Sequence, residues 1–287
     1  MDARRMTPGP LLPALAAVGV AGLFAAWAWF FLDTRRGQVL DELALRGSTI
    51  GAWRLDAHAE GLLQTVSVPA VALAMAVVLI VGLVRGRVGA AVVGAGVVAA
   101  ANVSTQLLKY TVLTRPDLIP GDHAANSLPS GHTTVAASIV VGVLIVVGRR
   151  LRPFLTVAGV VVVTAFGYAT LVNQWHRPSD VSAAVLVACG WAYAGEALLR
   201  LRRRVDPEPV RRSPVAGVLI ALGLLALGVT VITGMLVWGV GLADASRAEQ
   251  FLAYAGGSAA LAGLVAVGLG VLLTLRQRSD APRLRER

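Results

Sequence analysis

A histidine and an aspartate four residues apart occur in the polar segment NQWHRPSD, residues 173–180. At this spacing the Asp180 carboxylate can bind one ring nitrogen of His176 and leave the other free. An imidazole oriented in this way is a candidate nucleophile or general base. The segment also fits a simpler interpretation, a polar turn in which Pro178 and Ser179 begin a helix. On its own, it does not decide between the two.

A second histidine follows a short turn in SLPSGHTT, residues 127–134, directly before an apolar run. A helix that begins here would present unpaired backbone N–H groups and the positive end of its dipole, which suits a phosphate. Ser130 can cap this helix or donate a hydrogen bond, and Gly131 lets a ligand approach the backbone closely. The alternative is an ordinary N-cap with His132 at the membrane interface.

Amide and cationic side chains form a third group in NVSTQLLKYTVLTRP, residues 102–116. Asn102, Gln106 and Lys109 are four and three residues apart, so they form one polar stripe along a helix. Lys109 is the only lysine among 26 lysine and arginine residues. The residue before a proline is disfavoured in a helix, which predicts that this helix ends by Arg115. Both cations could instead anchor the helix end at lipid headgroups.

Long apolar runs surround these three segments. The chain has 287 residues, of which 56% are hydrophobic, and its mean hydropathy is +0.71. Several runs approach about 20 residues, the length that crosses the hydrocarbon core of a bilayer. We therefore predict an all-α fold, a polytopic bundle of membrane helices. The eight predicted spans are residues 10–32, 65–84, 88–108, 131–148, 154–175, 181–199, 214–240 and 251–275.

The net charge of +10 comes from short basic clusters between the apolar runs. With a cytoplasmic N-terminus, 18 of the 26 lysine and arginine residues lie on the cytoplasmic side, which predicts that both termini are cytoplasmic. The three polar segments then lie together at the outer ends of spans three to six. Because the charge serves as a topology signal, we do not expect nucleic acid as a partner. Cleavage of the first span as a signal peptide is less favoured by its length and would not change the later orientation.

Together, the three segments resemble the signature of the type 2 phosphatidic acid phosphatase superfamily, which includes lipid phosphate phosphatases and vanadium haloperoxidases. PSGH matches completely, and HRPSD matches the family's His-x3-Asp. The family's first motif has six residues between Lys and Arg-Pro, whereas KYTVLTRP has five. Its third motif begins with Ser-Arg, where this chain has Ala169 and Thr170. One phosphate-binding arginine is therefore absent, and Arg177 is the obvious replacement.

The resemblance implies a two-step phosphoryl transfer that needs no metal ion or other cofactor. His176 would attack phosphorus and become phosphohistidine, while Asp180 orients the ring and stabilises its positive charge. His132 would protonate the leaving group and then activate water. The residues that would bind the phosphoryl oxygens are Lys109, Arg115, Ser130, Gly131 and Arg177.

The expected protein is a metal-independent lipid phosphatase of the cytoplasmic membrane with its active site outside. Its partners would be membrane lipids and a phosphorylated lipid substrate, of the polyprenyl pyrophosphate or phosphatidate type. One alternative is a phosphotransferase that passes phosphate from His176 to another acceptor. Another is a catalytically weak lipid-binding or transport protein, suggested by Thr170 and the short first motif. The sequence does not indicate the oligomeric state.

The expected domain organisation follows from the spans. Residues 1–204 would form the phosphatase domain, with the motif-bearing core in residues 65–199. A cytoplasmic linker, residues 205–213, would lead to two additional membrane helices in residues 214–275. Residues 276–287 would form a charged cytoplasmic tail. Within residues 33–64, a short helix at the outer interface and a plain connector are both open.

Overall fold

A computed structural model describes residues 9–50, 59, 61, 63–65, 68–119, 125–201 and 213–279. In this part of the chain, all regular secondary structure is helical. The apolar helices are α1 (Leu11–Asp33), α4 (Val68–Val84), α5 (Val88–Leu107), α6 (Gly131–Val146), α7 (Arg152–Val172), α8 (Pro178–Leu201), α9 (Pro214–Leu236) and α10 (Arg247–Ser279). One helix corresponds to each of the eight predicted spans, so the predicted all-α fold is confirmed.

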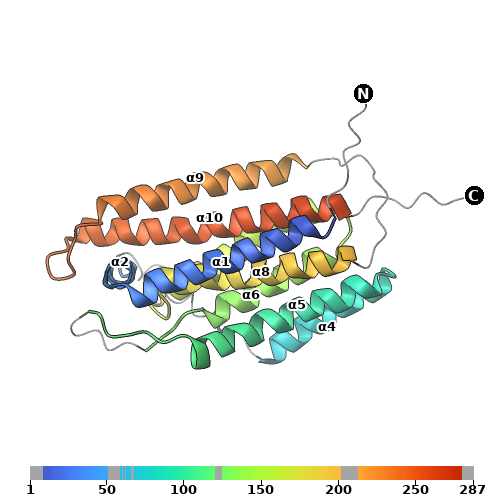
Figure 1. The fold of residues 1–287 in the computed structure, drawn as a ribbon, viewed down its shortest axis with the longest axis horizontal. Coiled ribbons are helices and arrows are strands. Elements are labelled where there is room, and N and C mark those ends of the chain that lie inside the picture. Colours follow the sequence, from blue (N-terminus) through green and yellow to red (C-terminus); the bar gives the residue numbers. More distant parts are fainter. Residues whose placement is uncertain are drawn as a thin grey trace, which may run out of the picture.

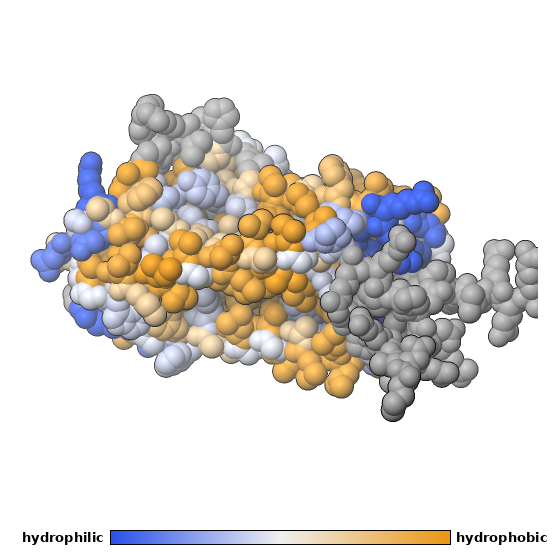
Figure 2. All heavy atoms as spheres, turned by 90° about the horizontal axis from the view of Figure 1, so that it is seen from above, coloured by the Kyte–Doolittle hydropathy of each residue, from blue (hydrophilic) through white to orange (hydrophobic). Residues whose placement is uncertain are grey.

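The helices are arranged as a bundle suited to lipid. Six of them are long and apolar enough to cross a membrane, and α4 and α6 contain shorter apolar stretches. They run along the long axis of the molecule, and the start of α1 lies at the same end as the end of α10 (Figure 1). On the face shown in Figure 2, apolar side chains cover the middle and hydrophilic ones gather toward the two ends. This pattern fits a bundle whose sides face hydrocarbon.

The core of the bundle lies around α8, most of whose residues are buried. α10 packs against α7 and α8, and Leu261, Leu269 and Leu272 from α10 belong to the main apolar core. α9 packs on the outside of α10 through small residues. A Cβ atom on Gly223 would lie 2.8 Å from the carbonyl oxygen of Gly263, so only glycine permits this approach. α10 therefore completes the core, and α9 lies on its outer side.

Charged side chains are buried between α8 and α10 near the end of the bundle where α10 stops. Glu196, fully buried, lies 3.0 Å from Arg200 Nε and 2.7 Å from Arg276 Nη1. Arg276 Nη2 also donates to the carbonyl oxygen of Ile145 in α6, at 2.7 Å. Because buried charges need partners, this network ties α10 to α6 and α8.

The domain division predicted from the sequence stays a prediction. Residues 205–212 of the predicted linker and residues 280–287 of the predicted tail lie outside the described residues.

A short helix, α2 (Arg35–Gly47), crosses the end of the bundle opposite the start of α1 (Figure 1). The chain bends sharply at Thr34, whose extended backbone separates α1 from α2 and whose Oγ1 accepts a hydrogen bond from the Gly37 N–H at 3.0 Å. Val39 and Leu43 on its inner face are buried in a small apolar cluster. A short helix is thus present in the first half of residues 33–64, while residues 51–58 lie outside the described residues.

The ends of three helices determine where the polar segments lie. α5 continues into a π-helical turn, η2 (Leu108–Val112), and stops before Arg115, as predicted. Ser130 has extended backbone and accepts a hydrogen bond from the Thr133 N–H, so it is the N-cap of α6. Pro178 occupies the first position of α8, where its missing N–H has no intrahelical partner to lose.

Candidate active site

The three polar segments meet at the end of the bundle that α2 crosses. The backbone N–H of Ser130 donates to the carbonyl oxygen of Asp180 at 3.0 Å, which joins the second segment to the third. Asn126 Nδ2 donates to the carbonyl oxygens of Lys109 and Leu128, both at 3.1 Å, which joins the first segment to the second. Segments far apart in the sequence are thus held together by a backbone–backbone hydrogen bond and by hydrogen bonds from the Asn126 side chain.

His176 and Asp180 form a buried pair. His176 Nδ1 lies 3.1 Å from Asp180 Oδ2, and both residues are buried. Asp180 Oδ2 also accepts hydrogen bonds from Ser127 Oγ at 2.6 Å and from the Arg177 N–H at 3.0 Å. These donors fix the carboxylate, which in turn fixes the imidazole and leaves Nε2 on the far side of the ring. Such a ring can act as a nucleophile or a base.

The N-terminus of α6 lies beside this pair. Ser130 is fully buried, and its hydroxyl also accepts a hydrogen bond from Thr133 Oγ1 at 3.1 Å. Among the described residues outside its own helix turn, Gln106 Nε2, at 4.0 Å, is the one atom that a Cβ atom on Gly131 would approach within 4 Å, so the backbone at Gly131 is open on this side. An anion could approach the N–H groups of this helix end.

The second histidine lies in the same region. His132 is half-buried, and its ring centroid is 5.4 Å from that of Trp175. It is also within electrostatic range of His176 and Lys109. The structure therefore brings both predicted catalytic histidines and the lysine together.

The predicted phosphate-binding cations differ in their surroundings. Lys109 Nζ lies 5.7 Å from the ring centroid of Tyr110, and Arg115 is half-buried in the segment after η2. Arg177 is buried, and its Nη2 lies 3.4 Å from Glu42 Oε2 in α2. Phosphate binding by these three cations stays a prediction.

Thr170, at the position of the family's arginine, has a structural role. It is fully buried, and its Oγ1 donates to the carbonyl oxygen of Gly167 at 2.7 Å. Its own carbonyl oxygen accepts hydrogen bonds from the N–H groups of Trp175 at 3.0 Å and His176 at 3.3 Å. Thr170 therefore shapes the turn that carries His176 without adding a positive charge.

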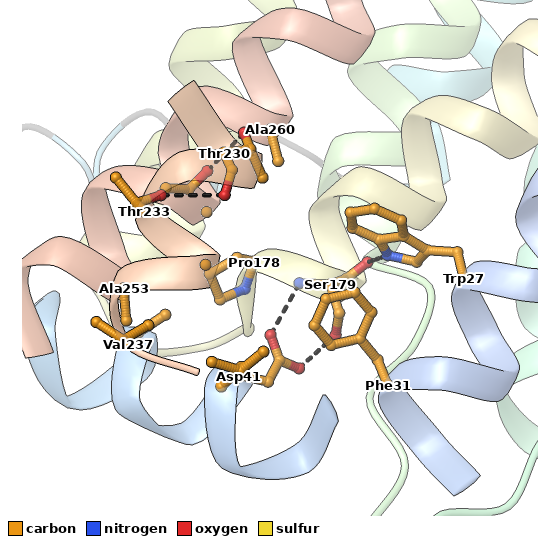
Figure 3. Close-up of a pocket in the computed structure, with 15 residues that line it drawn as sticks. Trp27, Phe31, Asp41, Pro178, Ser179, Thr230, Thr233, Val237, Ala253 and Ala260 are labelled. Carbon is orange, nitrogen blue, oxygen red and sulfur yellow. Dashed lines mark hydrogen bonds between the residues drawn. The ribbon is translucent and has the colours of Figure 1, made fainter. Parts of the chain in front are cut away.

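Asp41 is a site residue that the sequence did not single out. It is buried in α2, and its carboxylate accepts hydrogen bonds from the N–H of Ser179, at 3.1 Å, and from Ser179 Oγ (Figure 3). Burial, and then the charge on Asp180, raise the pKa of Asp41 to about 7, although Ser179 and Arg177 oppose this shift. The mixed charges of residues 33–64 left a short interfacial helix and a plain connector both open, and nothing in their spacing indicated which face would meet the site.

A cavity of about 80 Å³ lies next to Ser179, where α1, α2, α8, α9 and α10 meet. Trp27, Phe31 and Pro178 line it, together with mostly apolar residues from α9 and α10 (Figure 3). Trp27 Nε1 donates to the carbonyl oxygen of Ser179 at 3.1 Å. Among the described residues, no group of three or more His, Cys, Asp and Glu side chains could hold a metal ion.

The fold and the site define a bundle of apolar helices, several of them long enough to cross a membrane, with a buried His–Asp pair beside the N-terminus of α6. Residues 90–205 match the model of the PAP2 superfamily. The matched segment contains the three motifs, so the resemblance inferred from them is confirmed. α1, α2, α4, α9 and α10 lie outside it. No curated protein and no solved structure matches the chain.

Proposed function

We propose that the protein is a membrane phosphatase that removes a phosphoryl group from a lipid phosphate or pyrophosphate through a phosphohistidine at His176. The observation that carries this proposal is the contact of 3.1 Å between His176 Nδ1 and Asp180 Oδ2 inside a PAP2-superfamily segment. The match to this superfamily supports phosphatase-type activity. A protein that only bound lipid would need neither this pair nor a second histidine beside it.

In the first step, Nε2 of His176 attacks phosphorus, and the bond from phosphorus to the leaving oxygen breaks. His132 donates a proton to that oxygen, so the leaving group departs as an alcohol or a phosphate. The imidazole becomes positively charged as the P–N bond forms. The Asp180 carboxylate, in contact with Nδ1, compensates this charge.

In the second step, His132 removes a proton from a water molecule that attacks the phosphohistidine. The P–N bond breaks, inorganic phosphate leaves, and His176 returns to its neutral state. Negative charge on the phosphoryl oxygens changes little in total but shifts between atoms, so fixed donors can stabilise the transition state. We assign this role to the N–H groups at Gly131 and to Lys109, Arg115 and Arg177, with Ser130 positioning the helix end.

A lipid phosphate is the substrate class that best fits the position of the site. The motifs lie at an end of the bundle, and apolar side chains cover its sides (Figures 1 and 2). A lipid in the surrounding bilayer would bring its headgroup to this depth while its chains stay in hydrocarbon. The excess of arginine on the other side supports an extracytoplasmic site, where polyprenyl pyrophosphate or phosphatidate would be the substrate.

The test uses purified protein in nanodiscs with a chelator present. Phosphate release is measured with polyprenyl pyrophosphate, phosphatidate, phosphatidylglycerol phosphate and lipid phosphosugars, and the phosphoenzyme is trapped from a labelled substrate. We expect release from at least one lipid and a label that is lost in His176→Ala. Absence of release from all four classes, or normal turnover by His176→Ala, would overturn the proposal. Transfer of the label to an added alcohol in place of water would favour the phosphotransferase alternative.

A further inference from the structure

α2 contacts two parts of the candidate site, although it lies outside the segment that matches the superfamily. Gln38, buried on its inner face, donates from Nε2 to the carbonyl oxygen of Pro116 at 2.7 Å. Glu42, one turn further along, pairs with Arg177 at 3.4 Å. α2 therefore connects the segment of the first motif with that of the third.

Asp41 makes the most buried of these contacts. Its carboxylate accepts the hydrogen bonds from the N–H and the hydroxyl of Ser179, a residue 138 positions away in the chain. The first N–H groups of a helix have no partner within the helix, so a carboxylate from another helix can cap them. Asp41 thus caps α8 at the residue directly before Asp180.

Asp180 is not available for this capping role. Its Oδ2 accepts hydrogen bonds from His176 Nδ1, Ser127 Oγ and the Arg177 N–H. The two buried carboxylates therefore have separate functions. Asp180 orients the imidazole, and Asp41 holds the backbone that carries Asp180.

The turn before His176 needs external support. Gln174 has a φ angle of 56°, a left-handed conformation that residues other than glycine rarely adopt. Strained backbone of this kind persists only where the surrounding structure fixes it. Gln174 Nε2 donates to the carbonyl oxygen of Leu45 at 3.4 Å, so α2 contacts the turn at its beginning as well as at Ser179.

α2 is itself anchored by the C-terminal helices. Arg36 donates to the carbonyl oxygens of Val237 at 2.7 Å and Val240 at 2.9 Å, in the segment that follows α9. On α10, a Cβ atom added to Gly257 would lie 2.5 Å from Pro178 Cβ, so α10 packs directly against the first residue of α8. The helices outside the matched segment thus support the turn from two directions.

We propose that Asp41 is a positioning residue for phosphoryl transfer to His176. By fixing Ser179 in the first turn of α8, it fixes Asp180 against the imidazole. The apolar walls of the neighbouring cavity make the hydrogen bonds to Ser179 costly to lose. A displacement of about 1 Å at a reacting group can slow a reaction by roughly a hundredfold. The inference rests on the proposed function, because it concerns the same transfer.

The experiment is a rapid-quench single turnover with a labelled lipid that wild type hydrolyses. The rate constant of phosphoenzyme formation reports positioning, and the amplitude reports the fraction of folded sites. We expect Asp41→Ala to form the phosphoenzyme about ten- to a hundredfold more slowly at an amplitude close to that of wild type. Asp41→Asn should stay within about threefold, because an amide can accept from the Ser179 N–H and donate to its hydroxyl. KM should change little in both variants.

Glu249→Ala is the matched control. Glu249 accepts hydrogen bonds from the N–H of Ser246 at 2.8 Å and from its hydroxyl at 2.7 Å, so it caps α10 near the same end of the bundle. Its loss should lower stability and leave the rate constant unchanged.

Three results would overturn the positioning role of Asp41. They are a wild-type rate constant in Asp41→Ala, a reduced amplitude at the wild-type rate constant, and a rate constant in Asp41→Asn as low as in Asp41→Ala. A wild-type protein that forms no phosphoenzyme with any lipid overturns the proposed function itself. The wild-type and variant measurements therefore separate the two failures.

Discussion

Removing the charge of Asp180 should slow the proposed reaction far more than removing one of its hydrogen-bond donors. In the wild-type structure, Ser127 Oγ and the Arg177 N–H lie 2.6 and 3.0 Å from Asp180 Oδ2. In Asp180→Asn, the amide oxygen can still accept hydrogen bonds from both donors. The neutral amide cannot compensate the positive charge that develops on His176, although its oxygen, at the position of Oδ2, can still accept a hydrogen bond from Nδ1. We expect a loss of about 10³–10⁴-fold, or roughly 4–5.5 kcal/mol of transition-state stabilisation.

Ser127→Ala provides the graded comparison. It removes one donor to the carboxylate and leaves its charge and the His176 contact in place. A hydrogen bond to a charged group contributes about 1.5–3 kcal/mol, so we expect a loss of about ten- to a hundredfold. His176→Ala should form no phosphoenzyme at all.

The assay for this series is single-turnover phosphoenzyme formation by purified variants whose thermal unfolding resembles that of wild type. The predicted rate constants decrease from wild type to Ser127→Ala to Asp180→Asn, and His176→Ala should form no phosphoenzyme. An Asp180→Asn rate within about tenfold of wild type would refute the reasoning, because the carboxylate would then add no more than one ordinary hydrogen bond.

Four further predictions concern the rest of the molecule. Glu196→Gln should destabilise the protein by about 3–5 kcal/mol in denaturant unfolding, since it removes the negative charge that both buried guanidinium groups contact, and a change below about 1 kcal/mol would contradict this. If Arg177 binds phosphate, Arg177→Lys should reduce kcat/KM at least tenfold despite keeping the charge, because bidentate geometry is lost; wild-type kinetics would overturn phosphate binding by Arg177. In intact cells, an impermeant thiol reagent should label Asp244→Cys and not Arg150→Cys, and the reverse would overturn the orientation. Folding raises the pKa of Asp41 to about 7, so its contribution to the free energy of unfolding is complete below pH about 4 and is lost as the pH rises to about 7. In Asp41→Asn, the free energy of unfolding should lack this dependence on pH. Parallel pH profiles of wild type and variant would contradict this.

The fold was largely readable from the sequence because it depends on local patterns. An apolar run of membrane-spanning length has few alternatives to a helix in lipid, since every backbone polar group must be paired within the segment. Individual residues in the sequence also indicated where helices begin and end. Pro116 predicted the end of the helix before Arg115, and Ser130 and Pro178 marked helix starts.

The motifs also predicted the centre of the candidate site. His176 and Asp180 are four residues apart, so local geometry was enough to place their side chains in contact. His132 and Lys109 were expected near this pair because the end of one span and the start of the next lie on the same side of the membrane. The turn-forming residues and the charges between the spans indicate which ends these are.

Only the tertiary structure decided what surrounds the motifs. The carboxylate of Asp41 meets Ser179 across 138 residues, and Arg177, expected to face phosphate, lies against Glu42. Neither contact can be predicted from spacing or composition. Both depend on the bend at Thr34, which places α2 across the end of the bundle and determines which of its faces meets the site. The apolar pattern of α10 likewise required only a membrane helix, whereas its packing against α8 depends on close approach and buried charge pairs between distant segments. The sequence by itself therefore determined which segments form apolar helices and which residues form the three motifs, and the packing of distant helices determined how those motifs are supported.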